Sequence, residues 1–299
     1  MPKTIFKPIR QCAALLLPIA CAVLTACGGG GDVIEATPLP VLPSLKVALA
    51  QPSDRVVNSV GYDMQIQALV EPDPATSVLA QSKLGPNVML WAGDTKLKGF
   101  AEFPAFVAQA TKYGNIVHAY VYDELFWSGT GVEIGRHETA ALGAAKTTRD
   151  AGLKPVVVIL PDVILDPAFK VSDINAFDVI GIDVYPSIRP RDASQLGTCK
   201  YKDGANLYSS LLHCSVQKLR AQGYTGDIWY LYQGFGLHSL PVAELTAQLK
   251  KQRETIAAAA DIGAVGLMSW GEFLGAPEIA REPDLYPLAG TPLAALLVP

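Results

Sequence analysis

Short β-rich runs alternate with helical stretches along the chain from Leu45 onward. Several of these runs are continuously apolar, as expected for strands that are buried on both faces of a sheet. A repeated strand-then-helix order is typical of a parallel sheet covered by helices. The predicted strands are Leu45–Gln51, Met64–Val70, Asn87–Trp91, Ile116–Tyr122, Pro155–Leu160, Val179–Val184, Ile228–Tyr232 and Val265–Ser269.

Helical patterns lie between these strands, and several end at a glycine, which favours the end of a helix. The predicted helices are Phe103–Tyr113, Glu138–Ala151, Ala205–Gln222 and Val242–Ala260. Residues 45–299 therefore fit one α/β domain, a (β/α)₈ TIM barrel, which typically takes about 250 residues. The alternative is an open doubly wound sheet. It would be favoured by a Gly-rich dinucleotide-binding turn after an early strand, and the sequence contains none.

The N-terminus is predicted to be a targeting segment. Lys3, Lys7 and Arg10 give a basic start, and an apolar run follows from Cys12 to Leu24. That run is shorter than the roughly 20 residues that a membrane-spanning helix needs, and it fits a secretory signal. It ends in Leu24-Thr25-Ala26-Cys27, which resembles the lipobox of bacterial lipoproteins.

The lipobox resemblance implies cleavage before Cys27 and attachment of lipid to that cysteine. Residues 1–26 would then be the signal peptide, and the Gly- and Pro-rich residues 27–44 a tether. Lipoproteins kept at the inner membrane usually carry Asp at the position of Gly28. The resemblance therefore favours a lipid-anchored protein of the outer membrane, on its periplasmic or surface face. The alternative is an ordinary signal peptide with a stray cysteine.

The five cysteines divide according to this processing. Cys12 and Cys21 leave with the signal peptide and Cys27 carries lipid, so Cys199 and Cys214 remain in an oxidising compartment. We predict a disulfide between them, contributing about 3 kcal/mol by the loop-entropy argument. A metal site is the competing interpretation, and no His–Cys spacing supports it.

Composition and charge exclude several classes of protein. Half of the residues are apolar, which excludes a disordered chain. The chain has 24 Lys+Arg against 28 Asp+Glu, and removal of three basic residues with the signal leaves 21 against 28. This acidic balance argues against a nucleic-acid partner. No pair of histidines has metal-ligand spacing, so we expect no metal and no cofactor.

Carboxylates and aromatic residues follow the later strands, at the end of a barrel where functional residues sit. The fourth strand runs into Asp123-Glu124, the sixth into Asp183-Val184-Tyr185, the seventh into Gln233 and the eighth into Trp270-Gly271-Glu272. Aromatic rings stack on sugars, while carboxylates and amides bind hydroxyl groups. The combination predicts a carbohydrate as substrate or ligand.

Cleavage of a glycosidic bond requires two carboxyl groups, one of them protonated. Glu124 is the candidate acid, because it follows a strand directly and has aromatic neighbours. The competing interpretation of Asp123-Glu124 is an acidic pair that begins a helix. Trp91 and Trp229 lie inside strands as core residues or sugar platforms, and His118 is predicted to be an interior residue.

The chain resembles the retaining glycoside hydrolases of clan A. Their barrels carry an Asn-Glu pair after strand four, a nucleophilic Glu after strand seven and an aromatic residue at the end of strand eight. The resemblance places Asp123-Glu124 at the first position and Trp270 at the last, with Tyr185 at a strand-six aromatic position. It implies that Glu124 is the acid and that Asp123, Tyr185 and Trp270 bind sugar.

Gln233 departs from this pattern, because it occupies the position of the nucleophilic Glu and an amide is no nucleophile. Asp183 is one replacement, as the base of an inverting mechanism, and Glu272 is the other. Chitinase-like enzymes use an acetamido group of the substrate instead, but their strand-four acids are missing here. The sequence thus predicts a membrane-anchored glycosidase-like protein. The alternatives are a carbohydrate-binding lipoprotein without catalysis and a barrel that docks another envelope protein.

Overall fold

The barrel is closed and entirely parallel. The computed structural model describes residues 45–50, 64–67, 73–92, 101–125, 137–184, 207–233 and 264–269, all within one compact unit of the chain. The strands are β1 (Leu45–Ala50), β2 (Met64–Gln67), β3 (Val88–Trp91), β4 (Ile116–Tyr122), β5 (Lys154–Ile159), β6 (Val179–Val184), β7 (Asp227–Gln233) and β8 (Ala264–Ser269). Each strand pairs with its neighbours in chain order, and β1 pairs with β8. The predicted (β/α)₈ barrel is confirmed.

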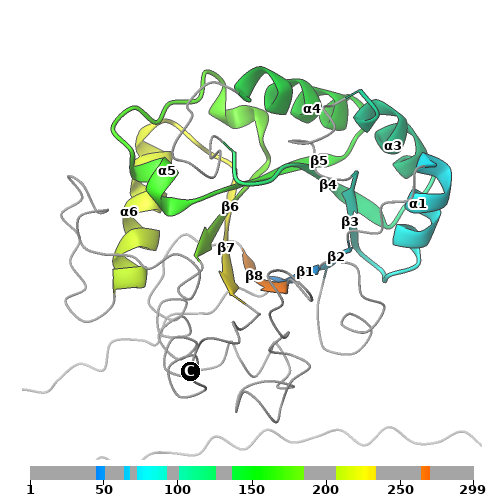
Figure 1. The fold of residues 1–299 in the computed structure, drawn as a ribbon, viewed down its shortest axis with the longest axis horizontal. Coiled ribbons are helices and arrows are strands. Elements are labelled where there is room, and N and C mark those ends of the chain that lie inside the picture. The colour runs from blue at the N-terminus through cyan, green and yellow to red at the C-terminus, as the bar shows by residue number, and fades with distance from the viewer. Residues whose placement is uncertain are drawn as a thin grey trace, which may run out of the picture. The chain divides into compact units, whose positions relative to one another are not determined.

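Helices cover the outer face of the strands (Figure 1). The described helices are α1 (Pro74–Ser82), α3 (Phe103–Ala110), α4 (Glu138–Asp150), α5 (Pro161–Leu165) and α6 (Leu207–Ala221), with a 3₁₀ turn η1 (Ile174–Ala176). The predicted helices Phe103–Tyr113, Glu138–Ala151 and Ala205–Gln222 correspond to α3, α4 and α6. The predicted helix Val242–Ala260 and the proposed segments 1–26 and 27–44 lie outside the described residues.

Two of the helices are followed by glycines whose backbone is in the left-handed region. Gly152 follows α4 with φ of 78°, and Gly223 follows α6 with φ of 85°. The amide of Gly152 donates to the carbonyl of Arg149 at 2.9 Å, and that of Gly223 donates to the carbonyl of Arg220 at 2.9 Å. Both stops were predicted from sequence, because glycine adopts positive φ without a steric penalty.

Helix α1 was not predicted, although its start signal is present in the sequence. Asp73 caps the helix, since its carboxylate accepts from the Thr76 amide at 2.9 Å and from the Thr76 hydroxyl at 2.7 Å. These hydrogen bonds lower the pKa of Asp73. Pro74 occupies the first turn, where a missing amide proton costs nothing. The short helix α5 was not predicted either, and Asp162 lies in its first turn.

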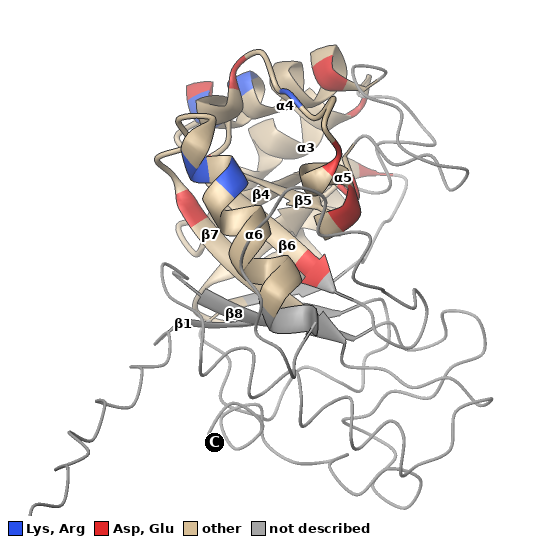
Figure 2. Ribbon diagram, turned by 90° about the vertical axis from the view of Figure 1, so that its left-hand side faces the viewer, with Lys and Arg blue, Asp and Glu red and all other residues tan. Residues whose placement is uncertain are grey.

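Strand side chains alternate between a layer beneath the helices and the interior of the barrel. Val88, Leu90 and Ile116 pack in the helix-facing core. His118 instead contacts Trp229, with ring centroids 5.6 Å apart. Strands β4 and β7 are not neighbours in the sheet, so this contact crosses the interior. Figure 2 shows most charged residues on the helices and their connections, while the strands carry few.

The barrel interior is tightly packed around Gly181 on β6. A Cβ atom at this position would lie 2.9 Å from Cδ1 of Leu231 and 3.1 Å from Cγ2 of Val158. These two residues come from the strands on either side of β6. The interior beneath the end of β6 is therefore filled by side chains, as is usual in this fold.

His118 makes stability depend on pH. It is buried, and burial lowers its pKa to about 4, with a further lowering by Lys154 and an opposing effect of Asp178. Below its ordinary value of 6.5 the unfolded chain takes up a proton that the folded protein refuses. Stability should be full above pH 6.5 and fall by on the order of 3 kcal/mol as the pH drops toward 4.

Urea unfolding of the wild type and of His118→Gln between pH 4 and 8 checks this prediction. The loss between pH 6.5 and 4 should be clearly smaller in His118→Gln. The matched substitution His213→Gln on α6, where the side chain is partly exposed, is the control for loss of an imidazole. Equal pH dependence in the wild type and His118→Gln would contradict it.

Candidate functional site

The carboxyl ends of the parallel strands meet at one mouth of the barrel, and five residues singled out from the sequence lie there. Trp91 ends β3, Asp123 and Glu124 follow β4, Asp183 is next to last in β6 and Gln233 ends β7. The predicted residues Tyr185, Trp270 and Glu272 lie outside the described residues. So does Cys199, and the disulfide to the buried Cys214 on α6 stays a prediction.

The backbone leaves the regular ladder just before Glu124. The pairing of β4 with β5 shifts between Tyr120 and Tyr122. Pairing continues at Tyr122, which aligns with Val157, and beyond the strand the Leu125 amide donates to the carbonyl of Val158 at 2.9 Å. Glu124 therefore lies in a kink that is held on both sides by strand pairing. A bulge of this kind re-aims a side chain at the rim of a barrel.

Glu124 pays for this placement with a strained backbone. Its φ is 45°, and it is the one non-glycine with positive φ in the part of the chain that the structure describes. This conformation costs a residue with a Cβ on the order of 1 kcal/mol. Such outliers persist where the surrounding structure holds them, and they cluster at functional sites. The competing interpretation, an acidic pair that begins a helix, concerns residues 126–136, which lie outside the described residues.

Asp123 is held by Tyr120, which lies three residues earlier, on β4. The hydroxyl of Tyr120 donates to Oδ1 of Asp123 at 2.7 Å. Tyr120 is only 4% exposed, and its ring stacks on that of Trp91, with centroids 4.8 Å apart and planes at 27°. Two aromatic residues at the mouth are thus packed against each other and tied to the acidic pair.

Helix α1 fixes Trp91 in turn. The side chain of Gln81 is fully buried. Its Nε2 donates to the carbonyl of Trp91 at 2.7 Å, and its Oε1 accepts from the amide of Trp91 at 2.7 Å. Both hydrogen-bonding groups of the Trp91 backbone are satisfied by one side chain. Sequence reasoning missed Gln81, because a polar residue on an amphipathic helix gives no sign of its partner.

Asp183 is fully buried near the end of β6. Burial of a carboxylate costs several kcal/mol unless it is well paired. Asp183 is therefore not an acidic residue that merely keeps the surface soluble. It aligns with Leu231 on β7, two residues before Gln233. Trp229 lies earlier on β7 and is 1% exposed. Of its two predicted roles, core residue or sugar platform, this burial supports the core residue.

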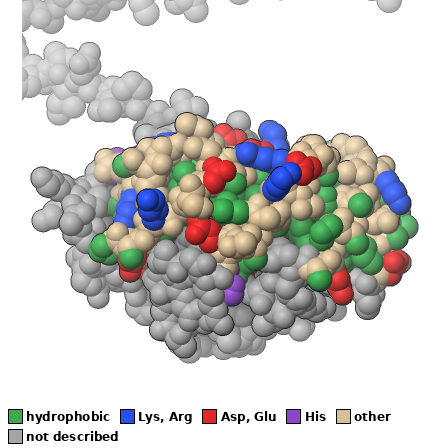
Figure 3. Space-filling model, turned by 90° about the horizontal axis from the view of Figure 1, so that it is seen from above, with side chains coloured by type: hydrophobic (Ala, Val, Ile, Leu, Met, Phe, Trp, Pro, Cys, Tyr) green, Lys and Arg blue, Asp and Glu red, His purple; other side chains and the backbone are tan. Residues whose placement is uncertain are grey.

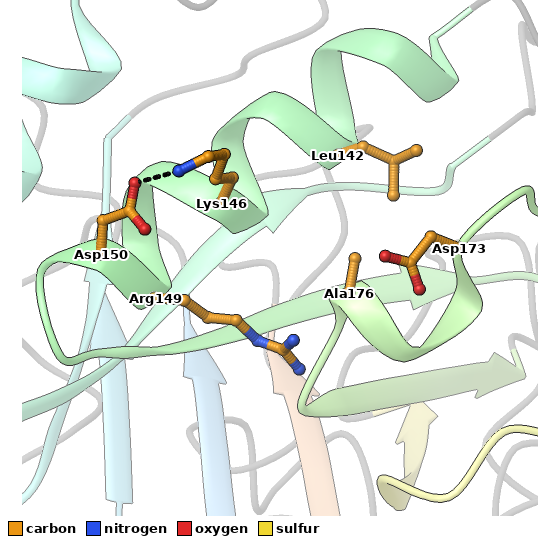
Figure 4. A pocket seen from close by; sticks show the side chains of 6 residues that line it. All are labelled: Leu142, Lys146, Arg149, Asp150, Asp173 and Ala176. Atoms are coloured by element: carbon orange, nitrogen blue, oxygen red, sulfur yellow. Dashed lines mark hydrogen bonds and ion pairs between the residues drawn. The ribbon is translucent and has the colours of Figure 1, made fainter.

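A hollow on the outer layer of the barrel carries no catalytic arrangement. It has a volume of about 430 Å³ and lies between α4 and η1, lined by Leu142, Lys146, Arg149, Asp150, Asp173 and Ala176 (Figure 4). Lys146 and Asp150 pair at 2.5 Å with both side chains largely exposed, so the pair contributes little to stability. Figure 3 shows basic and acidic side chains interspersed on the face it views.

The described residues contain no group of three or more His, Cys, Asp or Glu arranged to hold a metal ion. Among the described helices, none has both the length and the apolar character of a membrane span.

The backbone strain at Glu124 can be measured as a difference in stability between two variants. Glycine tolerates positive φ, so Glu124→Gly should be more stable than Glu124→Ala by about 1 kcal/mol. Both substitutions remove the carboxylate, which makes each the control for the other. Chemical unfolding of the two variants measures the difference, and equal stability would contradict a strained backbone at this position.

Comparison with known proteins reveals similarity in fold. No protein-family profile and no curated protein matches the chain by sequence. A β-1,3-glucanase and allergen of Cryptomeria japonica pollen matches with a TM-score of 0.51 and 12% identity, over 82% of this chain and 97% of the glucanase. A xylanase of Cellvibrio japonicus in complex with xylopentaose matches with a TM-score of 0.44 and 11% identity, over 77% of this chain and 58% of the xylanase.

A GH113 β-1,4-mannanase gives a TM-score of 0.42 and 13% identity, over 84% of this chain and 85% of the mannanase. These neighbours are clan A glycoside hydrolases with barrel folds. This chain spans little more than half the length of the xylanase and nearly all of the pollen glucanase. The fold therefore resembles that of glycoside hydrolases, and the chemistry has to be argued from the residues of this chain.

Proposed function

We propose that this protein is a lipid-anchored glycoside hydrolase of the bacterial cell envelope that acts on an oligo- or polysaccharide. The observation that carries the proposal is Glu124, an acidic residue held with φ of 45° at the carboxyl end of β4. A strained backbone at the mouth of a barrel favours a functional role for the side chain that it presents. The resemblance in fold to glycoside hydrolases supports the same chemistry.

In this proposal Glu124 is the general acid. It gives its proton to the glycosidic oxygen as the bond to the anomeric carbon breaks, so the leaving sugar departs as an alcohol. Asp183 is the base, and its carboxylate takes a proton from the water that attacks the anomeric carbon. The elements of water are thus added across the bond. Glu124 ends as the carboxylate and Asp183 as the protonated acid. Glu272 is the alternative partner from the end of β8.

The sheet favours Asp183 as the partner of an inverting mechanism. One strand, β5, separates β4 from β6, and neighbouring strands lie about 4.8 Å apart. The two backbones are then about 10 Å apart, and carboxyl groups of inverting enzymes are separated by about 6.5–9.5 Å. Gln233 supports the same choice, because an amide in the place of the nucleophile leaves no route through a covalent intermediate.

The remaining polar and aromatic site residues would bind sugar. Asp123 and Gln233 offer hydrogen bonds to hydroxyl groups, and Tyr185 and Trp270 offer rings for stacking. The second candidate function is a carbohydrate-binding lipoprotein without catalysis. Gln233 is the observation that favours it, because a hydrolase that has lost its nucleophile retains its sugar site.

The decisive experiment measures release of reducing ends from a panel of β-linked glucan, xylan and mannan. The wild type should release them, and Glu124→Gln should lower kcat by at least about 100-fold, because the amide has no acidic proton. Glu102→Gln is the matched control, since this exposed glutamate begins α3 and makes no side-chain cap bond. Binding without release by the wild type would overturn the enzyme and establish the carbohydrate-binding alternative.

Lipid anchoring rests on Cys27 and is tested separately. We expect Cys27→Ser to lose incorporation of radiolabelled palmitate and to move from the membrane to the soluble fraction, because several acyl chains are needed for stable anchoring. The matched substitution Cys21→Ser, inside the proposed signal peptide, should leave both unchanged. Labelling of Cys27→Ser at the wild-type level would contradict the proposed anchor.

A further inference from the structure

A continuous set of contacts joins helix α1 to the residue before Glu124. Gln81 holds both backbone groups of Trp91 at 2.7 Å. The ring of Trp91 stacks on Tyr120 at 4.8 Å, and the hydroxyl of Tyr120 donates to Asp123 at 2.7 Å. Each contact joins a different part of the fold, from the outer helix through β3 and β4 to the kink at the mouth.

We propose that Trp91 and Tyr120, anchored by Gln81, are positioning residues that hold the kink after β4 and thereby aim the carboxyl group of Glu124. The inference rests on the proposed function, in which the carboxyl group of Glu124 is the general acid. It adds that the geometry of the acid is set from the neighbouring strand and from helix α1. Asp123 is the link, because it is bonded to Glu124 in the chain and to Tyr120 through its side chain.

The need for such a support follows from the strain at Glu124. A residue with a Cβ relaxes from positive φ unless neighbouring contacts fix its surroundings. On one side the Leu125 amide is fixed by its bond to Val158. On the other side, Tyr122 aligns with Val157 of β5 after the register shift. Between these two fixed points, the bond from Tyr120 restrains the side chain of Asp123, the residue bonded to Glu124.

The Gln81 contact shows that the restraint begins in a rigid part of the protein. Gln81 is fully buried, and its Nε2 also lies 3.2 Å from the buried Ser77 hydroxyl one turn earlier in α1. The same end of the helix is also fixed by Asn115, whose Nδ2 donates to the carbonyls of Ser82 and Gly85 at 2.7 Å. The end of α1 that binds Trp91 is therefore itself held in place.

Tyr120→Phe isolates the inference, because it removes one hydroxyl and keeps the ring that stacks on Trp91. We expect kcat for glycan hydrolysis to fall about tenfold with KM within twofold of wild type, because a misplaced acid impairs the reaction rather than binding. In a Glu124→Gln background the same change should have no further effect on kcat, since residues that act through one another are not additive.

Tyr224→Phe is the matched control. The Tyr224 hydroxyl is also buried and donates to the carbonyl of Asp227 at 2.9 Å, at the opposite end of the barrel. Loss of this bond should affect stability and leave kcat and KM unchanged. An equal fall of kcat in both variants, a change in KM alone, or full additivity of Tyr120→Phe with Glu124→Gln would each overturn the inference.

A second measurement needs no activity, so it separates this inference from the proposed function. Glu124→Gly should exceed Glu124→Ala in folding equilibrium constant by about fivefold. With Tyr120→Phe added to both, the kink loses the restraint on the Asp123 side chain and the ratio should fall. An unchanged ratio overturns the positioning role. Loss of the ratio in a protein that cleaves no glycan supports the positioning role and rejects the hydrolase.

Discussion

Pairing between β1 and β8 closes the sheet, and the rest of the structure depends on that closure. A closed parallel barrel has no edges, so every strand is paired on both sides and every carboxyl end opens on the same mouth. Residues that are far apart in the chain, such as Trp91, Glu124 and Asp183, are brought to this mouth by the closure. Polar residues that follow different strands therefore lie at one end of the barrel.

The closure also divides the strands into two faces with different tolerances. The face beneath the helices is a conventional apolar core, in which Val88, Leu90 and Ile116 pack. The inner face admits His118 and Tyr120, and Asp183 is buried near the end of β6. Burial of such groups is costly, which is why each is informative: His118 takes a lowered pKa, and Tyr120 gives its hydroxyl to Asp123.

Much of the fold follows from the sequence in particular elements. The eight strands were predicted because short β-rich runs alternate with helical stretches, and the ends of α4 and α6 because Gly152 and Gly223 follow them. Helix α1 was missed although Asp73-Pro74 marks its start, because its few apolar residues give a weak periodic pattern. The site was predictable as a set of strand-end residues, of which Asp123, Glu124 and Asp183 are described near the ends of β4 and β6.

The sequence by itself determined the order of strands and helices, the positions of the acidic residues at strand ends and the amide of Gln233. These are local properties, since periodicity and composition act over a few neighbouring residues. Only the tertiary structure decided that Glu124 has positive φ and that Gln81 reaches Trp91 and Tyr120 reaches Asp123. The contact of Gln81 with Trp91 joins a helix to a strand, and the strain at Glu124 exists only because paired strands hold the chain on either side of it.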